Sequence, residues 1–122
     1  MDIKSYNAFC KSLPHSTHVV QWGGAHVWKI GGKVYAVGGW QDEDAELHVS
    51  FKVSPIAFEV LGDQPGLRPA PYLASRGMKW IQWMSDETLS QDELKEHIRT
   101  SYQIVGSGLT KKLQRELGLL ID

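Results

Sequence analysis

The sequence has little cysteine and no long apolar runs, and each absence excludes a class of protein. Cys10 is the single cysteine among 122 residues, so the chain cannot form an internal disulfide and fits a reducing compartment. No apolar run approaches the ~20 residues that span a bilayer. The first residues also lack the basic-then-apolar pattern of a secretory signal. We therefore expect a cytoplasmic protein without a membrane partner.

The chain also lacks an excess of positive charge. It has 13 Lys and Arg residues against 14 Asp and Glu residues, which gives a net charge of −1 at neutral pH. Dedicated nucleic-acid binders usually carry a basic excess, so only a local basic patch could support that function here. The length predicts one compact domain over residues 1–122, which we expect to be monomeric.

The common sequence signatures of catalysis are missing as well. The sequence contains no nucleophile elbow, no His-Glu-x-x-His, no Walker motif and no dinucleotide fingerprint. Asp42, Glu43 and Asp44 are adjacent acids in a predicted turn, which is not the arrangement of an acid and a base across a cleft. We expect a protein that is not an enzyme and that holds no cofactor.

A Gly-Gly-Lys segment, residues 31–33, lies within the stretch WKIGGKVYAV and has two interpretations. A phosphate-binding loop would need a helix directly after the lysine. Here Lys33 is followed by Val-Tyr-Ala-Val, which is typical of a strand, so the two glycines predict a tight hairpin turn. With a two-residue loop, the expected pairs are Ile30 with Lys33, Trp28 with Tyr35, and His26 with Val37.

Hydrophobic periodicity predicts a helix, four strands, a helix, one further strand and two helices. Ser54 with Pro55 marks the start of the second helix, and Ser90 with Glu93 forms a capping box at the start of the third. The proline- and glycine-rich residues 62–78 predict an extended connection. The expected ranges are a helix over 2–13, strands His18–Trp22, His26–Ile30, Lys33–Gly38 and Glu46–Val53, a helix from Ser54, a strand over 79–83, a helix from Ser90 to a break or kink at Gly106–Gly108, and a last helix carrying Leu109, Leu113 and Leu117.

The spacing of apolar residues also predicts the buried side of each helix. Cys10 falls on the buried stripe of the first helix, where we expect it to behave as a small apolar side chain rather than a nucleophile. The expected buried stripes are Tyr6, Phe9, Cys10 and Leu13 in the first helix, Ile56, Ala57, Val60 and Leu61 in the second, and Leu94, Ile98, Ser101 or Tyr102, and Val105 in the third.

Five stretches of the sequence are informative together: FCKSLP, VWKIGGKVYAV, SFKVSP, GLRPAPYL leading to KW, and SYQIVGSGLTKK. In combination they resemble the MmcQ/YjbR family of small bacterial proteins, and they follow the family order over nearly the whole chain. The resemblance implies a single-domain α+β fold with an antiparallel sheet and flanking helices, comparable with frataxin-like and double-wing architectures. It also implies DNA binding, the family's conventional label. Tyr72 stands where the family often has a histidine.

The best candidate for a binding surface is the segment over residues 66–83, which is basic and aromatic and contains no acidic residue. Its cations would pair with phosphates and its rings would stack on bases. Lys33 and Lys52 match family positions and would extend the patch. In the alternative interpretation, the aromatic residues anchor the segment to the sheet and the cations are solvated. The candidate residues are Arg68, Arg76 and Lys79 for phosphates, Tyr72 and Trp80 for stacking, Trp83 as a further aromatic residue, and Lys33 and Lys52 as supporting cations.

Two other functions compete with DNA binding. The five tryptophans could form the walls of a groove for a small molecule or a protein segment, a function that needs no net positive charge. A frataxin-like metal role would need acids along one edge, and the acidic stretch over residues 41–46 is the one candidate. Cys10, His15 and His18 have ligand-like spacing, but Cys10 is predicted to face the core, so we expect no metal site.

Overall fold

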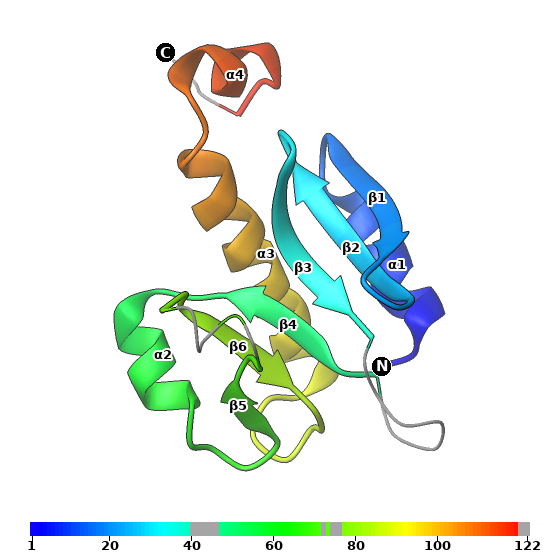
Figure 1. The fold of residues 1–122 in the computed structure, drawn as a ribbon, viewed down its shortest axis with the longest axis vertical. Coiled ribbons are helices and arrows are strands. Elements are labelled where there is room, and N and C mark those ends of the chain that lie inside the picture. The colour runs from blue at the N-terminus through cyan, green and yellow to red at the C-terminus, as the bar shows by residue number, and fades with distance from the viewer. Residues whose placement is uncertain (40–46, 72, 74–76, 120–122) are drawn as a thin grey trace.

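The structure is a computed structural model that describes residues 1–39, 47–71, 73 and 77–119 (Figure 1). The described residues form one six-stranded antiparallel sheet in the order β1-β2-β3-β4-β6-β5, with helices packed around it. This confirms the predicted α+β fold with an antiparallel sheet and flanking helices. The elements are α1 (Ile3–Ser12), β1 (Ser16–Gln21), β2 (Ala25–Ile30), β3 (Lys33–Gly38), β4 (Val49–Lys52), α2 (Pro55–Leu61), β5 (Leu67–Pro69), β6 (Trp80–Trp83), α3 (Gln91–Ser107) and α4 (Lys111–Glu116).

The main hydrophobic core lies between the sheet and two helices. In Figure 1, α1 and α3 run behind the sheet, and α3 contacts β3 and β4. We call this side of the sheet the helix face and the other side the open face. A smaller apolar cluster occupies the open face. The helix-face core includes Tyr6, Trp28, Tyr35, Phe51, Ile81, Trp83, Leu94, Ile98 and Tyr102, and the open-face cluster consists of Ala25, Val27, Val37, Ala70 and Trp80.

The starts of α2 and α3 were predicted correctly from their capping residues. The Ser54 hydroxyl accepts a hydrogen bond from the Ala57 N–H, and Ser90 and Glu93 form both halves of a capping box. The predicted stripe of α3 is buried, including both Ser101 and Tyr102. The helix passes through Gly106 without a break and ends with Gly108 as its C-cap.

The hairpin between β2 and β3 is confirmed, but most of its predicted register is wrong. Gly31 and Gly32 have φ values of 58° and 81°, the left-handed conformations that a two-residue turn requires. The pairing shifts by one residue next to Trp28, which lies opposite Ala36 instead of Tyr35. His26 consequently lies opposite Gly38 instead of Val37. The cause is a β-bulge, which places an extra residue in β3 and cannot be read from alternation alone.

Two other predictions, on α2 and on the connection that follows it, are corrected. In α2, Ile56 and Val60 are 78% and 58% exposed, while Phe58 and Leu61 pack against the core. The connection over residues 62–78 contains a strand, β5, which pairs with β6 at the edge of the sheet. A three-residue strand that ends in proline gives almost no periodic signal, which is why the sequence pattern missed it.

Candidate binding site on the open face

The sheet splits between β3 and β4. Only Ala36–Gly38 of β3 pairs with Val49–Phe51 of β4, and beyond these residues the two strands separate. Ser101 of α3 occupies the split, where its hydroxyl donates to the Tyr35 carbonyl at 2.6 Å and accepts from the Lys52 N–H at 2.8 Å. The Ser101 side chain therefore takes the place of the next hydrogen bonds between β3 and β4 and keeps the two strands apart. We call the gap between these strands the fork.

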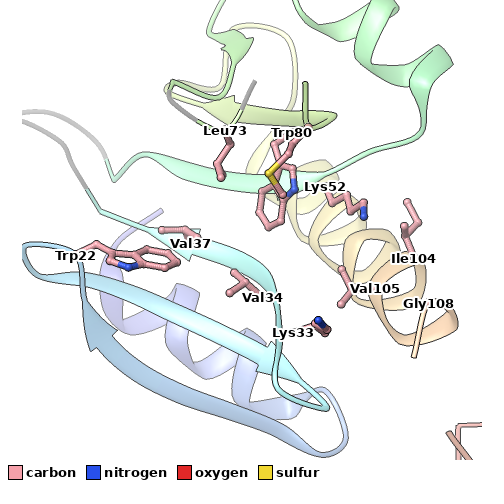
Figure 2. Close-up of a pocket in the computed structure, with 11 residues that line it drawn as sticks. Trp22, Lys33, Val34, Val37, Lys52, Leu73, Trp80, Ile104, Val105 and Gly108 are labelled. Carbon is pink, nitrogen blue, oxygen red and sulfur yellow. The ribbon is translucent and has the colours of Figure 1, made fainter. Parts of the chain in front are cut away.

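The fork contains a cavity of about 470 Å³ between β3, β4 and the C-terminal half of α3 (Figure 2). A second cavity of about 490 Å³ adjoins it and shares Lys52, Met78, Trp80 and Ile104. We call the two together the fork groove. The first cavity is lined by Trp22, Lys33, Val34, Val37, Lys52, Leu73, Met78, Trp80, Ile104, Val105 and Gly108, and the second adds Val53, Ser54, Pro55, Gly77 and Lys79.

Trp80 forms the centre of this groove. Its ring points into the fork, with Lys52 beside it (Figure 2). The side chain is only 3% exposed, so it offers no free face on which a base could stack. The stacking role proposed for Trp80 therefore does not fit this geometry. Its indole Nε1 is buried and has no hydrogen-bond partner among the described residues.

The candidate cations lie around the groove and along the open face. Lys33 is exposed at the start of β3, and Lys52 is half-buried at the end of β4; both line the first cavity. Lys79 lines the second cavity, with its Nζ 4.8 Å from the centre of the Phe58 ring. The Nε of Arg68 donates to Gln82 Oε1 at 2.8 Å.

Strand register places the cation of the edge strand on the same face as the groove. Arg68 pairs with Gln82, which pairs with Ser50 of β4, and paired residues share a face. Lys52 is two residues from Ser50 and pairs with Trp80, so it also projects to the open face. The structure thus brings Lys52, Trp80 and Arg68, which come from three strands, to one side of the sheet.

Charge is segregated between the strands and the rest of the chain. The six described strands contain Lys29, Lys33, Lys52 and Arg68 and no acidic residue, although the whole chain has a net charge of −1. The acidic side chains therefore belong to helices and connections. The total charge of the chain hides this segregation. A count within the predicted strands shows it only in part, because the predicted range Glu46–Val53 includes an acid and the strand that carries Arg68 was not predicted.

Of the three remaining aromatic and basic candidates, one lies on the helix face and two fall outside the described residues. Trp83 is fully buried on the helix face, where its Nε1 donates to the Leu89 carbonyl at 2.9 Å, so it takes no part in the open face. Tyr72 and Arg76 lie outside the described residues, and their roles stay predictions. The acidic stretch over residues 41–46, proposed as the metal-binding alternative, also lies outside them.

Metal ligation gains no candidate from the described residues. In that part of the chain, no three His, Cys, Asp or Glu side chains come together in a way that could hold a metal ion. The nearest arrangement is a stacked pair, His18 and His26, with Nε2 and Nδ1 3.0 Å apart. Nor does any helix within the described ranges have the length and apolarity to cross a membrane.

Comparison with known proteins identifies the family. The YjbR family profile matches residues 11–104. The fold resembles the crystal structure of Deinococcus radiodurans protein DR2400, described as a DUF419 domain, with a TM-score of 0.83, 28% identity, and coverage of 98% of this chain and 89% of that one. A Pseudomonas syringae protein is similar in fold, with a TM-score of 0.67, 19% identity, and coverage of 86% of this chain and 99% of that one. No curated protein matches. Because the family profile matches most of the sequence, as the motifs had indicated, the chain belongs to the YjbR family.

Proposed function

We propose that this chain is a non-enzymatic DNA-binding protein whose open face contacts the phosphate backbone. The observation that carries the proposal is the charge of the sheet, because every charged residue in the described strands is basic. Lys52 and Arg68 project from the open face, and Lys33 stands at the rim of the fork groove. Lysine and arginine side chains at such positions neutralise phosphates and release condensed counterions.

The same geometry favours binding without sequence specificity. Phosphate contacts position a protein on DNA but carry no sequence information. Trp80 is too deeply buried to stack on a base, so the proposal rests on the cations alone. With roughly three phosphate contacts, the logarithm of the binding constant should fall with a slope near −3 against the logarithm of salt concentration.

The test is a fluorescence titration of labelled duplexes of unrelated sequence at several salt concentrations. Arg68→Gln should weaken binding to all of them alike and reduce the salt slope by about one. Lys4→Gln is the matched control, since Lys4 is exposed on α1, behind the opposite face of the sheet. An affinity that does not depend on salt concentration, or an equal loss of affinity in both variants, would contradict the phosphate contacts.

The fork groove favours a second candidate, a small-molecule-binding module. Its walls are mostly apolar, it includes a buried tryptophan, and it needs no net positive charge on the protein. Under this function, substitution of Trp80 would reduce ligand binding and substitution of Arg68 would not, the opposite of the pattern expected for DNA.

A further inference from the structure

We propose that the fork groove binds an organic anion, a carboxylate carried on an apolar or aromatic body. This inference deepens the second candidate function and stands apart from DNA binding. It rests on three properties of the groove: its apolar walls, the two lysines on opposite sides of the fork, and the buried indole N–H of Trp80, which has no acceptor among the described residues.

The apolar walls of the groove favour a ligand with an apolar body. Val34 and Val37 of β3 and Ile104 and Val105 of α3 line the first cavity from its two sides, and Met78 lines both cavities. A cavity of about 470 Å³ lies within the usual size of small-molecule pockets. An apolar ring or short chain would replace water against these side chains.

The two lysines favour a ligand with a negative charge. Lys33 extends from β3 and Lys52 from β4, so an anion in the fork would lie between two ammonium groups. Among the described residues that line the groove, none is acidic to neutralise them. A single negative charge suits this site better than a dianion, because the apolar walls make each additional charge expensive to desolvate.

The indole N–H of Trp80 favours a ligand that carries a hydrogen-bond acceptor. Its Nε1 can only donate, and no described residue accepts from it. A ligand that displaces the side chains packed over the ring would bring an oxygen to this donor and recover the free energy that the missing hydrogen bond costs. The ammonium groups of Lys33 and Lys52 also only donate. The Ser54 hydroxyl, at the far end of the groove, already accepts the Ala57 N–H as a helix cap. A carboxylate, which accepts and does not donate, matches these donors, whereas an amine does not.

The test is an NMR titration that follows the indole N–H resonances, with naphthylacetate as the probe. The Trp80 signal, assigned by its loss in Trp80→Phe, should move downfield as the N–H gains an acceptor. Naphthylacetamide keeps the ring and the carbonyl oxygen but lacks the charge, so it should bind about three- to ten-fold more weakly. Naphthylethylamine, a cation of the same size, should not bind.

Variants separate the proposed contacts from general effects. Lys52→Gln and Trp80→Phe should each weaken naphthylacetate about three- to ten-fold, and Lys29→Gln, a strand lysine that does not line the groove, should change nothing. The Lys52→Gln result decides the matter if Trp80→Phe fails to fold. No binding at millimolar probe, or binding that tolerates both variants, would overturn the inference. Neither result would alter the Arg68-dependent salt slope that tests DNA binding.

Discussion

Two tryptophans on one short strand differ in their surroundings because they project to opposite faces of the sheet. Trp80 and Trp83 both lie on β6 and are almost fully buried, but they project to opposite faces of the sheet. Trp83 completes its hydrogen bond with the Leu89 carbonyl and belongs to the core. Trp80 keeps a buried donor that no described residue satisfies, at the wall of a cavity. The unpaired donor, rather than the aromatic ring alone, marks the binding position.

Cys10 illustrates the opposite case, a reactive group made inert by its surroundings. The thiol is fully buried on α1, and burial raises the pKa of Cys10 to about 12. Only the thiolate attacks disulfide reagents, so the native protein should resist labelling at neutral pH. We expect labelling by an aromatic disulfide reagent to proceed at the rate of unfolding and to become complete in denaturant. Rapid labelling of the native protein would show that the thiol is accessible.

At the scale of elements, Ser101 joins α3 to the two strands that it separates. Its hydroxyl satisfies the Tyr35 carbonyl and the Lys52 N–H, which have no partner across the fork. Ser101→Ala would leave both backbone groups buried without a hydrogen-bond partner, or it would force the fork to close. We expect a loss of roughly 1–3 kcal/mol in the free energy of unfolding, measured in urea.

The control for this substitution lies on the same helix. Ser107 is exposed, and its hydroxyl contacts only the Ile104 carbonyl of its own helix. Ser107→Ala should therefore change the free energy of unfolding by less than about 0.5 kcal/mol. Similar losses for both serines would mean that the hydroxyl of Ser101 does not bridge the strands.

Local signals made most of the elements predictable. The Gly31-Gly32 turn, the Ser54 cap and the Ser90 capping box act within a few residues, and each element that they mark was found. The β-bulge opposite Trp28 and the edge strand β5 depend on pairing with distant segments, so periodicity could not reveal them.

The candidate site was only half predictable for the same reason. Lys52 and Arg68 were found as basic residues within the chain, but their shared face follows from pairing through β6. The fork itself depends on Ser101, which lies 66 residues from Tyr35 in the sequence. A polar residue on an apolar helix stripe was the one available sign of that contact.

For the whole molecule, two histidines link stability to pH. His97 of α3 packs its ring against Phe51, and burial lowers the pKa of His97, although Glu93 partly offsets the effect. His18 stacks on Trp28, and burial together with the nearby His26 lowers the pKa of His18. Because both folded pKa values lie below the usual 6.5, the unfolded chain binds protons first as the pH falls. The contribution of both residues to stability is therefore complete above pH 6.5 and is lost as the pH falls below it.

We expect the free energy of unfolding, measured in urea, to decrease between about pH 7.5 and about pH 5.5. His97→Gln carries no titrating group, so this variant should show a smaller decrease, and adding His18→Gln should reduce it further. The Asp2 carboxylate, whose pKa is held below 3.8 mainly by the hydrogen bond from the Ser5 N–H, does not titrate in this range. A free energy that stays constant or rises as the pH falls would contradict the assignment. An unchanged slope in His97→Gln would place the proton-linked group elsewhere in the molecule.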